Sequence, residues 1–368
     1  MKIAVDATAL YGRYNGVEYA LWNLLSALRE LDQENHYVIY VPRDGPSRAS
    51  RREWNGSERE RWQWKFLPFR GRDKMRRIWW QQAILPRQLL RDGCRILHAP
   101  TYVMPLRATV PTLLTVYDLI ALTHPQFATR ANRLHYSALL GKSLARATCI
   151  SVPSETVKRA VVSHLPAAAR KTHVVPLGVE PIFRAPVTEE IKGQVRARYA
   201  LPDKFLLFVG NFEPKKNLRG LMRALELLPQ APPLVLAGGA RAWNHNENFT
   251  ARMQTTGYVE RRDLPALYAM CEVFVFPSLA EGFGLPVLEA LACGAAVVTS
   301  AEVPLPDLSS AALICDARDP ASIARAIERV LNDQSLRDDL RVRARRYAEP
   351  FGRQRTAQMT LDLYRSLI

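Results

Sequence analysis

Short apolar runs rich in β-branched residues alternate with longer amphipathic stretches along the whole 368-residue chain. This alternation constrains the fold more than any other feature, because strands separated by helices pair in parallel and form α/β layers. The rhythm starts with a strand at residues 2–6, stops after residues 174–179 and begins again with a strand at 205–209. The chain is also too long for one ordinary core. The sequence therefore predicts an α/β protein with two Rossmann-like, doubly wound domains.

The predicted boundary between the two domains follows residue 185, so that the domains span residues 1–185 and 186–350. Doubly wound sheets bind their ligands beyond the carboxyl ends of their strands. The unusual residue clusters of this chain fall at such strand ends. We therefore expect the chemistry in a cleft between two domains that face each other.

Hydrophobic residues make up 48% of the chain and charged residues 23%, as is typical of a soluble globular protein. No apolar run approaches the roughly 20 residues that span a bilayer, and no signal stretch opens the chain. The five cysteines are scattered without metal-ligand spacing, which indicates reduced thiols. These features predict a cytoplasmic protein.

The net charge of +16 is concentrated in residues 41–95, which hold fifteen Lys or Arg residues and six Asp or Glu residues. Cations beside aromatic side chains are typical of a surface that binds anionic lipid. The segment therefore predicts peripheral binding to the inner face of the plasma membrane. A solvated basic loop whose tryptophans pack on the domain, and a nucleic-acid surface, are the two alternatives. The tryptophans of this segment are Trp54, Trp62, Trp64, Trp79 and Trp80.

The densest motif covers residues 277–290, where a buried strand enters a glycine-rich turn and a helix follows. Pro286 stands where the first helical residue is expected. Gly282 and Gly284 allow the backbone to come close to a ligand. Amides before Leu288 lack helical partners, and together they form an anion site suited to a diphosphate.

Two carboxylates bracket this turn, because Glu281 lies on the loop and Glu289 lies about one turn into the helix. Carboxylates beside an anion site repel the anion unless they have another task, such as accepting hydrogen bonds from sugar hydroxyls. The alternative is an ordinary turn between strand and helix with solvated acids. The whole constellation favours a site for a nucleotide sugar.

The spacing of Glu281 and Glu289, with Gly-Phe-Gly-Leu-Pro between them, resembles the E-x7-E motif of glycosyltransferase family 4. This large family of retaining enzymes has the GT-B fold, and the chain is similar to its bacterial mannosyl- and hexosyltransferases of surface-polysaccharide assembly. The resemblance also implies that residues 351–368 pack back on the first domain. Further matches lie at residues 12–16, 118–120, 174–179, 209–218, 257–259, 264–268 and 294–300.

The resemblance implies a role for each residue of the donor site. Lys216, helped by Lys215, would hold the diphosphate, Glu281 would lie near the transferred sugar, and Glu289 would bind the ribose. The chain departs from the family at Asn211, where relatives commonly have an arginine that adds a phosphate charge. Also on the donor side, backbone amides of Gly282, Phe283, Gly284 and Leu285 would meet phosphate or hexose, Tyr258 and Val259 would line the base, and Gly16 would bring amides toward a phosphate.

The first half holds the acceptor candidates. Tyr117-Asp118 stands where the family often has His-Asp, and tyrosine does not titrate near neutral pH, which argues against a general base there. Asp118 is interpreted either as a catalytic group or as a structural cap. Glu18 would touch the acceptor or favour the start of its helix. His98 is either an acceptor contact or a hydrogen-bonded histidine at a strand end.

The function implied by the resemblance is transfer of a hexose, with retention at the anomeric carbon, from GDP-mannose or a UDP-sugar. The acceptor would be a saccharide or a polyprenyl-linked saccharide in cell-surface glycan synthesis. A GT-B epimerase or phosphorylase is the alternative, and a basic nucleic-acid-binding protein a distant one. No recognised nucleic-acid motif is present, so no such partner is predicted. No cofactor or metal is implied, because lysine and helix amides supply the positive field.

Overall fold

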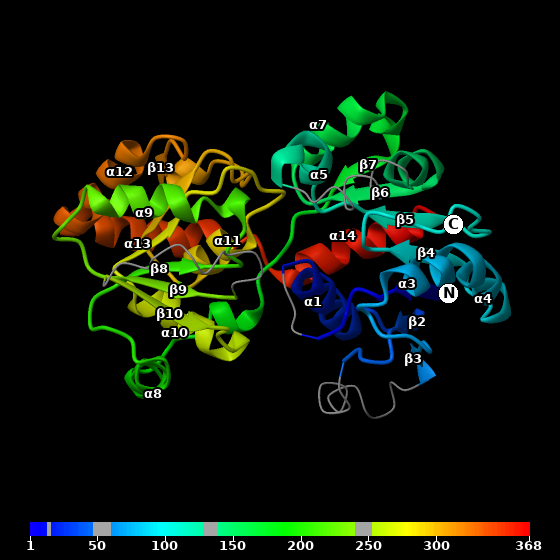
Figure 1. The fold of residues 1–368 in the computed structure, drawn as a ribbon. Coiled ribbons are helices and arrows are strands. Elements are labelled where there is room, and N and C mark those ends of the chain that lie inside the picture. Colours follow the sequence, from blue (N-terminus) through cyan, green and yellow to red (C-terminus); the bar gives the residue numbers. More distant parts are fainter. Residues whose placement is uncertain (13–15, 47–59, 128–138, 240–251) are drawn as a thin grey trace. The chain divides into compact units, whose positions relative to one another are not determined.

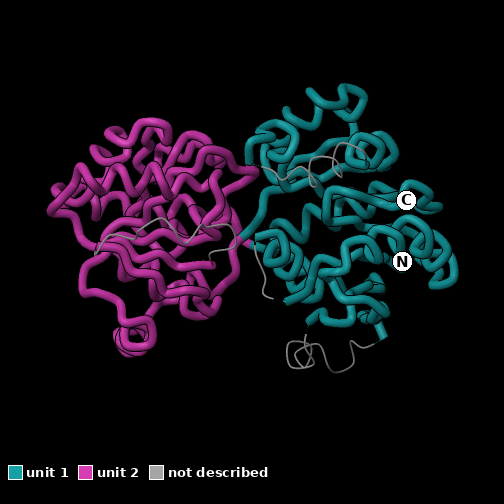
Figure 2. Tube along the Cα trace, in the orientation of Figure 1, with its two compact units in different colours: residues 1–178, 353–368 teal, residues 179–352 magenta. Residues whose placement is uncertain are grey.

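The computed structural model describes residues 1–12, 16–46, 60–127, 139–239 and 252–368. These residues form two compact units, coloured separately in Figure 2. Unit 1 comprises Met1–Gly178 together with Arg353–Ile368, and unit 2 comprises Val179–Gly352. The chain therefore leaves unit 1 earlier than the boundary expected after residue 185.

Unit 1 is built on a seven-stranded parallel sheet with the strand order β3-β2-β1-β4-β5-β6-β7 (Figure 1). The strands are β1 (Lys2–Asp6), β2 (His36–Val41), β3 (Trp62–Phe66), β4 (Ile96–Ala99), β5 (Thr112–Thr115), β6 (Cys149–Val152) and β7 (Thr172–Val174). The helices are α1 (Gly16–Leu31), α3 (Lys74–Trp79), the π-helix η2 (Trp80–Ile84), α4 (Leu85–Arg91), α5 (Ile120–Thr123), η3 (Pro125–Phe127), α7 (Glu155–His164), η4 (Pro166–Lys171) and α14 (Arg353–Arg365).

Unit 2 is built on a six-stranded parallel sheet with the strand order β10-β9-β8-β11-β12-β13. The strands are β8 (Leu206–Val209), β9 (Leu234–Ala237), β10 (Met253–Gly257), β11 (Val273–Phe276), β12 (Val297–Ser300) and β13 (Leu313–Cys315). The helices are η5 (Pro181–Phe183), α8 (Glu189–Tyr199), η6 (Pro214–Lys216), α9 (Leu218–Glu226), η7 (Arg261–Asp263), α10 (Leu264–Met270), α11 (Leu285–Ala292), η8 (Leu308–Ser310), α12 (Pro320–Asn332) and α13 (Gln334–Ala348).

The central strands of both sheets are buried on both faces, which is why they appear in the sequence as continuous apolar runs. All four residues of β8, β9, β11 and β12 are buried. In unit 1, α14 packs against α1, and Thr356 Oγ1 donates to the carbonyl of Pro176 at 2.7 Å (Figure 1). The doubly wound architecture predicted for both halves is confirmed.

Two of the four described tryptophans of the basic segment lie in the core of unit 1. Trp62 stacks on Tyr37 with ring centroids 4.1 Å apart, and Trp80 packs against Tyr40 at 5.5 Å. Trp64 is half-buried, whereas Trp79 is 63% exposed. The packing interpretation is therefore right for Trp62 and Trp80, and Trp54 lies outside the described residues.

Among the described residues, no helix combines the length and the apolar character that crossing a bilayer requires.

Candidate active site

The glycine-rich turn between β11 and α11 is the frame of the candidate site in unit 2. Gly284, the last residue before the helix, has a φ of +95°, and a Cβ placed on it would lie 2.4 Å from Val303 Cγ1. Any other residue would be strained in this conformation and would also clash with Val303. The helix begins at Leu285, and Pro286 lies in its first turn, where its missing N–H costs no hydrogen bond.

Three backbone amides at the start of α11 donate no hydrogen bond within the described part of the chain, those of Phe283, Gly284 and Leu285. The amides of Val287 and Leu288 both donate to the Gly284 carbonyl, at 3.0 and 3.1 Å. The amides free to bind an anion therefore end at Leu285, earlier than the sequence suggested, because those of the first helical turn already donate to the Gly284 carbonyl. Unpaired amides at a helix N-terminus attract an anion.

Lys216 and Glu281 meet beside this turn. The ammonium of Lys216, at the end of η6, lies 2.5 Å from Glu281 Oε1, and Ser278 Oγ donates to the same oxygen at 2.7 Å. Lys216 Nζ also lies 4.7 Å from the centroid of the Phe276 ring. The amide of Leu279 donates to the Lys215 carbonyl at 2.7 Å. Backbone and side chains thus bind the turn after β8 to the turn after β11.

The Lys216–Glu281 pair is almost excluded from solvent, with side chains 12% and 8% exposed. Burial alone would raise the pKa of Glu281, but Lys216 and Lys215 more than offset it and hold that pKa below its usual value. Glu281 is therefore a carboxylate at neutral pH, and the site carries a fixed pair of opposite charges.

Glu289 is buried and has partners of its own. Its Oε1 lies 2.6 Å from Nη2 of Arg261, and Tyr268 donates a hydrogen bond to its Oε2 at 3.3 Å. Burial raises the pKa of Glu289, and the nearby Arg261 opposes that rise without cancelling it. Solvated acids, the alternative drawn from the sequence, are therefore wrong for Glu289 and for Glu281.

Sequence reasoning missed Arg261. The residue lies in η7 between the two stretches, 257–259 and 264–268, on which the family resemblance rests. The adjacent cations Arg261 and Arg262, a few residues after β10, were the available signal. Only one of the two is buried, because Arg261 is 15% exposed and Arg262 is 72% exposed.

The remaining donor candidates lie at the carboxyl ends of the neighbouring strands. Asn211 is half-buried and follows Gly210 directly after β8. A Cβ on Gly238 would approach the Gly210 carbonyl to 2.0 Å, so these two strand ends pack backbone against backbone. After β10, the side chain of Tyr258 is 39% exposed while Val259 is buried. Their contacts with a nucleotide remain predictions.

In unit 1, Asp118 makes the contacts of a cap. Its Oδ1 accepts a hydrogen bond from the amide of Ile120 at 3.0 Å, and its Oδ2 accepts one from the Tyr102 hydroxyl at 3.2 Å. Tyr117 is buried, and burial together with the charge of Glu18 raises the pKa of its hydroxyl. Tyr117 therefore stays protonated at neutral pH and offers a hydrogen-bond donor.

Two other unit 1 candidates lie at opposite extremes of exposure. Gly16, the first residue of α1, is exposed, and a Cβ placed there would meet open space. His98 is 1% exposed, with Nδ1 2.7 Å from the Tyr364 hydroxyl and Nε2 2.8 Å from Thr115 Oγ1. Burial lowers the pKa of His98 to about 3. These contacts are those of the alternative stated for His98, a hydrogen-bonded histidine at a strand end, and both ring nitrogens are engaged inside the unit.

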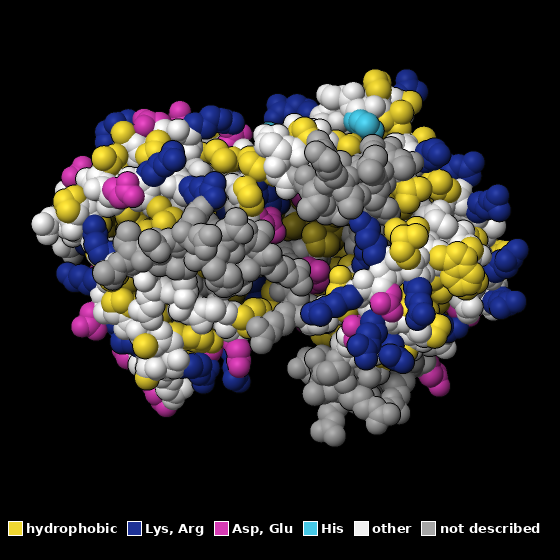
Figure 3. Space-filling model, in the orientation of Figure 1, with side chains coloured by type: hydrophobic (Ala, Val, Ile, Leu, Met, Phe, Trp, Pro, Cys, Tyr) yellow, Lys and Arg dark blue, Asp and Glu magenta, His cyan; other side chains and the backbone are white. Residues whose placement is uncertain are grey.

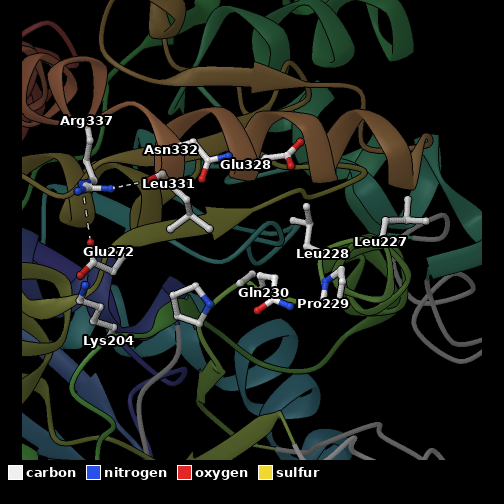
Figure 4. A pocket seen from close by; sticks show the side chains of 12 residues that line it. Lys204, Leu227, Leu228, Pro229, Gln230, Glu272, Glu328, Leu331, Asn332 and Arg337 are labelled. Carbon is white, nitrogen blue, oxygen red and sulfur yellow. Dashed lines mark hydrogen bonds and ion pairs between the residues drawn. The ribbon is translucent and has the colours of Figure 1, made fainter.

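A pocket of about 650 Å³ opens at the other edge of the unit 2 sheet, at the amino ends of β8, β9 and β11 (Figure 4). Arg337 points toward Glu272 there, with Nε 3.7 Å from Oε2, and also donates to the carbonyls of Val330 and Leu331. Ligands of such sheets bind at the carboxyl ends of the strands. The pocket is therefore separate from the candidate site.

Known proteins resemble the chain along both halves. A family model described as Glycosyltransferase Family 4 matches residues 14–182, and one described as Glycosyl transferases group 1 matches residues 193–347. A sucrose-phosphate synthase from Thermosynechococcus elongatus shares the fold with a TM-score of 0.78 at 22% identity, covering 100% of this chain and 99% of that one. Fold and site thus define a glycosyltransferase with the GT-B fold.

Two curated relatives come from Escherichia coli. The O-antigen chain mannosyltransferase B is 32% identical over 288 residues, which are 74% of each protein. The serotype-specific mannosyltransferase WbdA is 29% identical over 290 residues, which are 74% of this chain and 36% of that longer protein. The chain belongs to glycosyltransferase family 4.

Proposed function

We propose that this enzyme transfers mannose from GDP-mannose, with retention at the anomeric carbon, to a saccharide or polyprenyl-linked saccharide of a surface polysaccharide such as the O-antigen. The buried Lys216–Glu281 pair beside the three amides at the start of α11, which donate no hydrogen bond within the described residues, carries this proposal. Mannose is favoured because both E. coli relatives are named mannosyltransferases.

Each group has a task in the reaction. As the glycosidic bond breaks, negative charge develops on the leaving diphosphate, and Lys216 with the amides of Phe283, Gly284 and Leu285 stabilises it. An ammonium has three donors, so Lys216 can bind Glu281 and phosphate together. Glu281, ionised and fixed, accepts hydrogen bonds from hydroxyls of the sugar. The acceptor hydroxyl attacks the anomeric carbon from the face that the diphosphate leaves, and its proton passes to the leaving phosphate.

The donor is tested by incubating the full chain with GDP-mannose, UDP-glucose and UDP-galactose and following sugar transfer and thermal shift. We expect GDP-mannose to raise the melting temperature and to be consumed only when acceptor is present. NMR of the product should show an α-linked mannose. Consumption of donor without acceptor would indicate an epimerase or hydrolase, and exclusive use of a UDP-sugar would contradict the proposed donor.

We also propose that the reaction needs no bound divalent metal, since Lys216 and the helix amides supply the positive field at the diphosphate. Turnover should be the same with excess EDTA as with added Mg²⁺. Loss of activity on chelation, restored by one metal, would contradict this.

The lipid-linked acceptor requires an approach to the membrane, and unit 1 has a surface suited to it. In α3 and α4, Met75, Trp79 and Leu90 are 78%, 63% and 60% exposed. Figure 3 shows hydrophobic side chains among Lys and Arg side chains over this region. We propose that this basic apolar surface binds anionic lipid. Its cations are Arg72, Lys74, Arg76, Arg77, Arg87 and Arg91.

A further inference from the structure

Arg261 lies between two carboxylates that come from distant parts of unit 2. Its Nε donates to Glu180 Oε1 at 2.7 Å, and its Nη2 lies 2.6 Å from Glu289 Oε1. The guanidinium carbon is 4.5 Å from the centroid of the Phe183 ring. The arginine is thus held on three sides, by two ions and one aromatic face.

Only an arginine can make this set of contacts. The guanidinium is planar, offers donors in a fork and stacks on aromatic rings, whereas a lysine ammonium is a compact point charge. All three ionic side chains are largely buried, at 15% exposed for Arg261 and Glu180 and 3% for Glu289. A buried cation with two carboxylate partners costs desolvation that an apolar side chain would avoid. Its presence points to a task beyond stability.

The task follows from how Glu289 is held. Arg261 binds one carboxylate oxygen and Tyr268 donates to the other, so the plane of the carboxylate is fixed from two sides. A carboxylate has about four lone-pair positions, and these contacts leave two for another donor pair. Two adjacent hydroxyls of a ribose are such a pair.

We propose that Arg261 is a positioning residue, which orients Glu289 to accept hydrogen bonds from the ribose hydroxyls of the donor nucleotide and is itself held by Glu180. The inference rests on the proposed function, because it requires a nucleotide at this site. Glu180 is the second residue after the chain enters unit 2. The start of this unit therefore contributes to the geometry of the donor helix.

Nucleotide affinity, measured by titration calorimetry on the full chain, tests the proposal without relying on turnover. The probes are GDP and UDP, each with its 2′,3′-dideoxy form. Arg261→Met should weaken binding of the natural nucleotide about tenfold or more, since a hydrogen bond to an ion is worth that much. The same change should alter binding of the dideoxy form by less than about twofold. Without the ribose hydroxyls, the orientation of Glu289 no longer matters, so the loss of Arg261 and the loss of the hydroxyls are coupled.

Arg262→Met is the matched control, because this neighbour pairs with Glu260 on the surface and lies in the same short helix. It should leave both affinities unchanged. If circular dichroism shows that Arg261→Met does not fold, Arg261→Lys is used in its place. Lysine keeps the positive charge but lacks the planar set of guanidinium donors, and the same comparison of natural and dideoxy nucleotide applies.

Equal losses for the natural and the dideoxy nucleotide would overturn the proposal, because Arg261 would then act on the fold as a whole. Unchanged affinity for both nucleotides in Arg261→Met would overturn it as well. So would a loss of affinity in Arg262→Met equal to that in Arg261→Met. A wild-type protein that binds neither GDP nor UDP would overturn the proposed function, and the role of Arg261 with it.

Discussion

The two units use their charged side chains in opposite ways. At the carboxyl edge of its sheet, unit 2 buries two cations against two carboxylates, Lys216 with Glu281 and Arg261 with Glu289. The same edge of unit 1 holds a buried neutral network, in which His98 bonds Thr115 and Tyr364. Unit 1 also carries cations on its surface, and among those on α3 and α4, Arg76, Arg87 and Arg91 are exposed.

This difference separates two kinds of electrostatic action. A buried ion pair acts at one point with fixed geometry, and salt screens it little. Exposed cations each contribute little, act in sum and are screened. Unit 2 therefore has the means to stabilise one charged transition state, whereas unit 1 has the means to hold a charged surface.

The largest effect is expected at the Lys216–Glu281 pair. Lys216→Ala and Glu281→Gln should each lower turnover by roughly 10²–10³-fold, the cost of losing one preorganised charge at a developing anion. Steady-state kinetics measure this, with circular dichroism to show an intact fold. Lys204→Ala is the control, because this lysine lies at the other edge of the sheet. Near-normal turnover in either site variant would remove that residue from the site.

The next effect concerns the basic apolar surface of unit 1. Replacing Arg72, Lys74, Arg76 and Arg77 with serine should weaken binding to vesicles of anionic lipid by roughly ten- to a hundredfold at moderate salt, since each cation contributes up to about 1 kcal/mol. Co-sedimentation measures it, and rising salt should release the wild type. Activity on a short soluble acceptor should survive. Wild-type protein that ignores anionic vesicles at low salt would contradict the proposal.

Glu289→Ala should act on binding more than on chemistry. A ribose contact is the same in the ground state and the transition state, so its loss raises the donor KM by about tenfold and changes kcat much less. Initial rates over a range of donor concentration separate the two constants. An unchanged KM with a collapsed kcat would place Glu289 at the reacting centre.

The smallest effect is a pH dependence that arises in unit 1. The pKa of His98 is lowered to about 3 in the folded protein, so the folded state binds fewer protons than the unfolded state below about pH 6.5. Its contribution to stability is present above that pH and is lost as pH falls toward 3. His98→Asn should flatten the fall in melting temperature between about pH 6.5 and 5, where few carboxylates titrate. An identical slope in both proteins would contradict the assignment.

The family and the glycine-rich turn of the donor site could be predicted from local sequence patterns. The strand of residues 273–276, the turn glycines and the two glutamates lie within one short segment, so spacing alone predicts that they share a site. The same reasoning did not reach Arg261, because its partners Glu180 and Glu289 are far from it in the chain and in different elements. No local pattern states which of two adjacent arginines points inward.

The sequence by itself determined the architecture, since alternating apolar runs of two lengths permit only parallel sheets with helices between the strands. It also determined which ionisable groups are available near the strand ends, because Lys216 and Glu281 follow strands and Glu289 lies in the helix after the second of them, in the order that the resemblance requires. Only the tertiary structure decided which polar groups are buried together. It placed His98 inside a neutral network and exposed Trp79 while burying Trp80. Burial and ion pairing depend on contacts between distant segments, and these form only when the chain is packed.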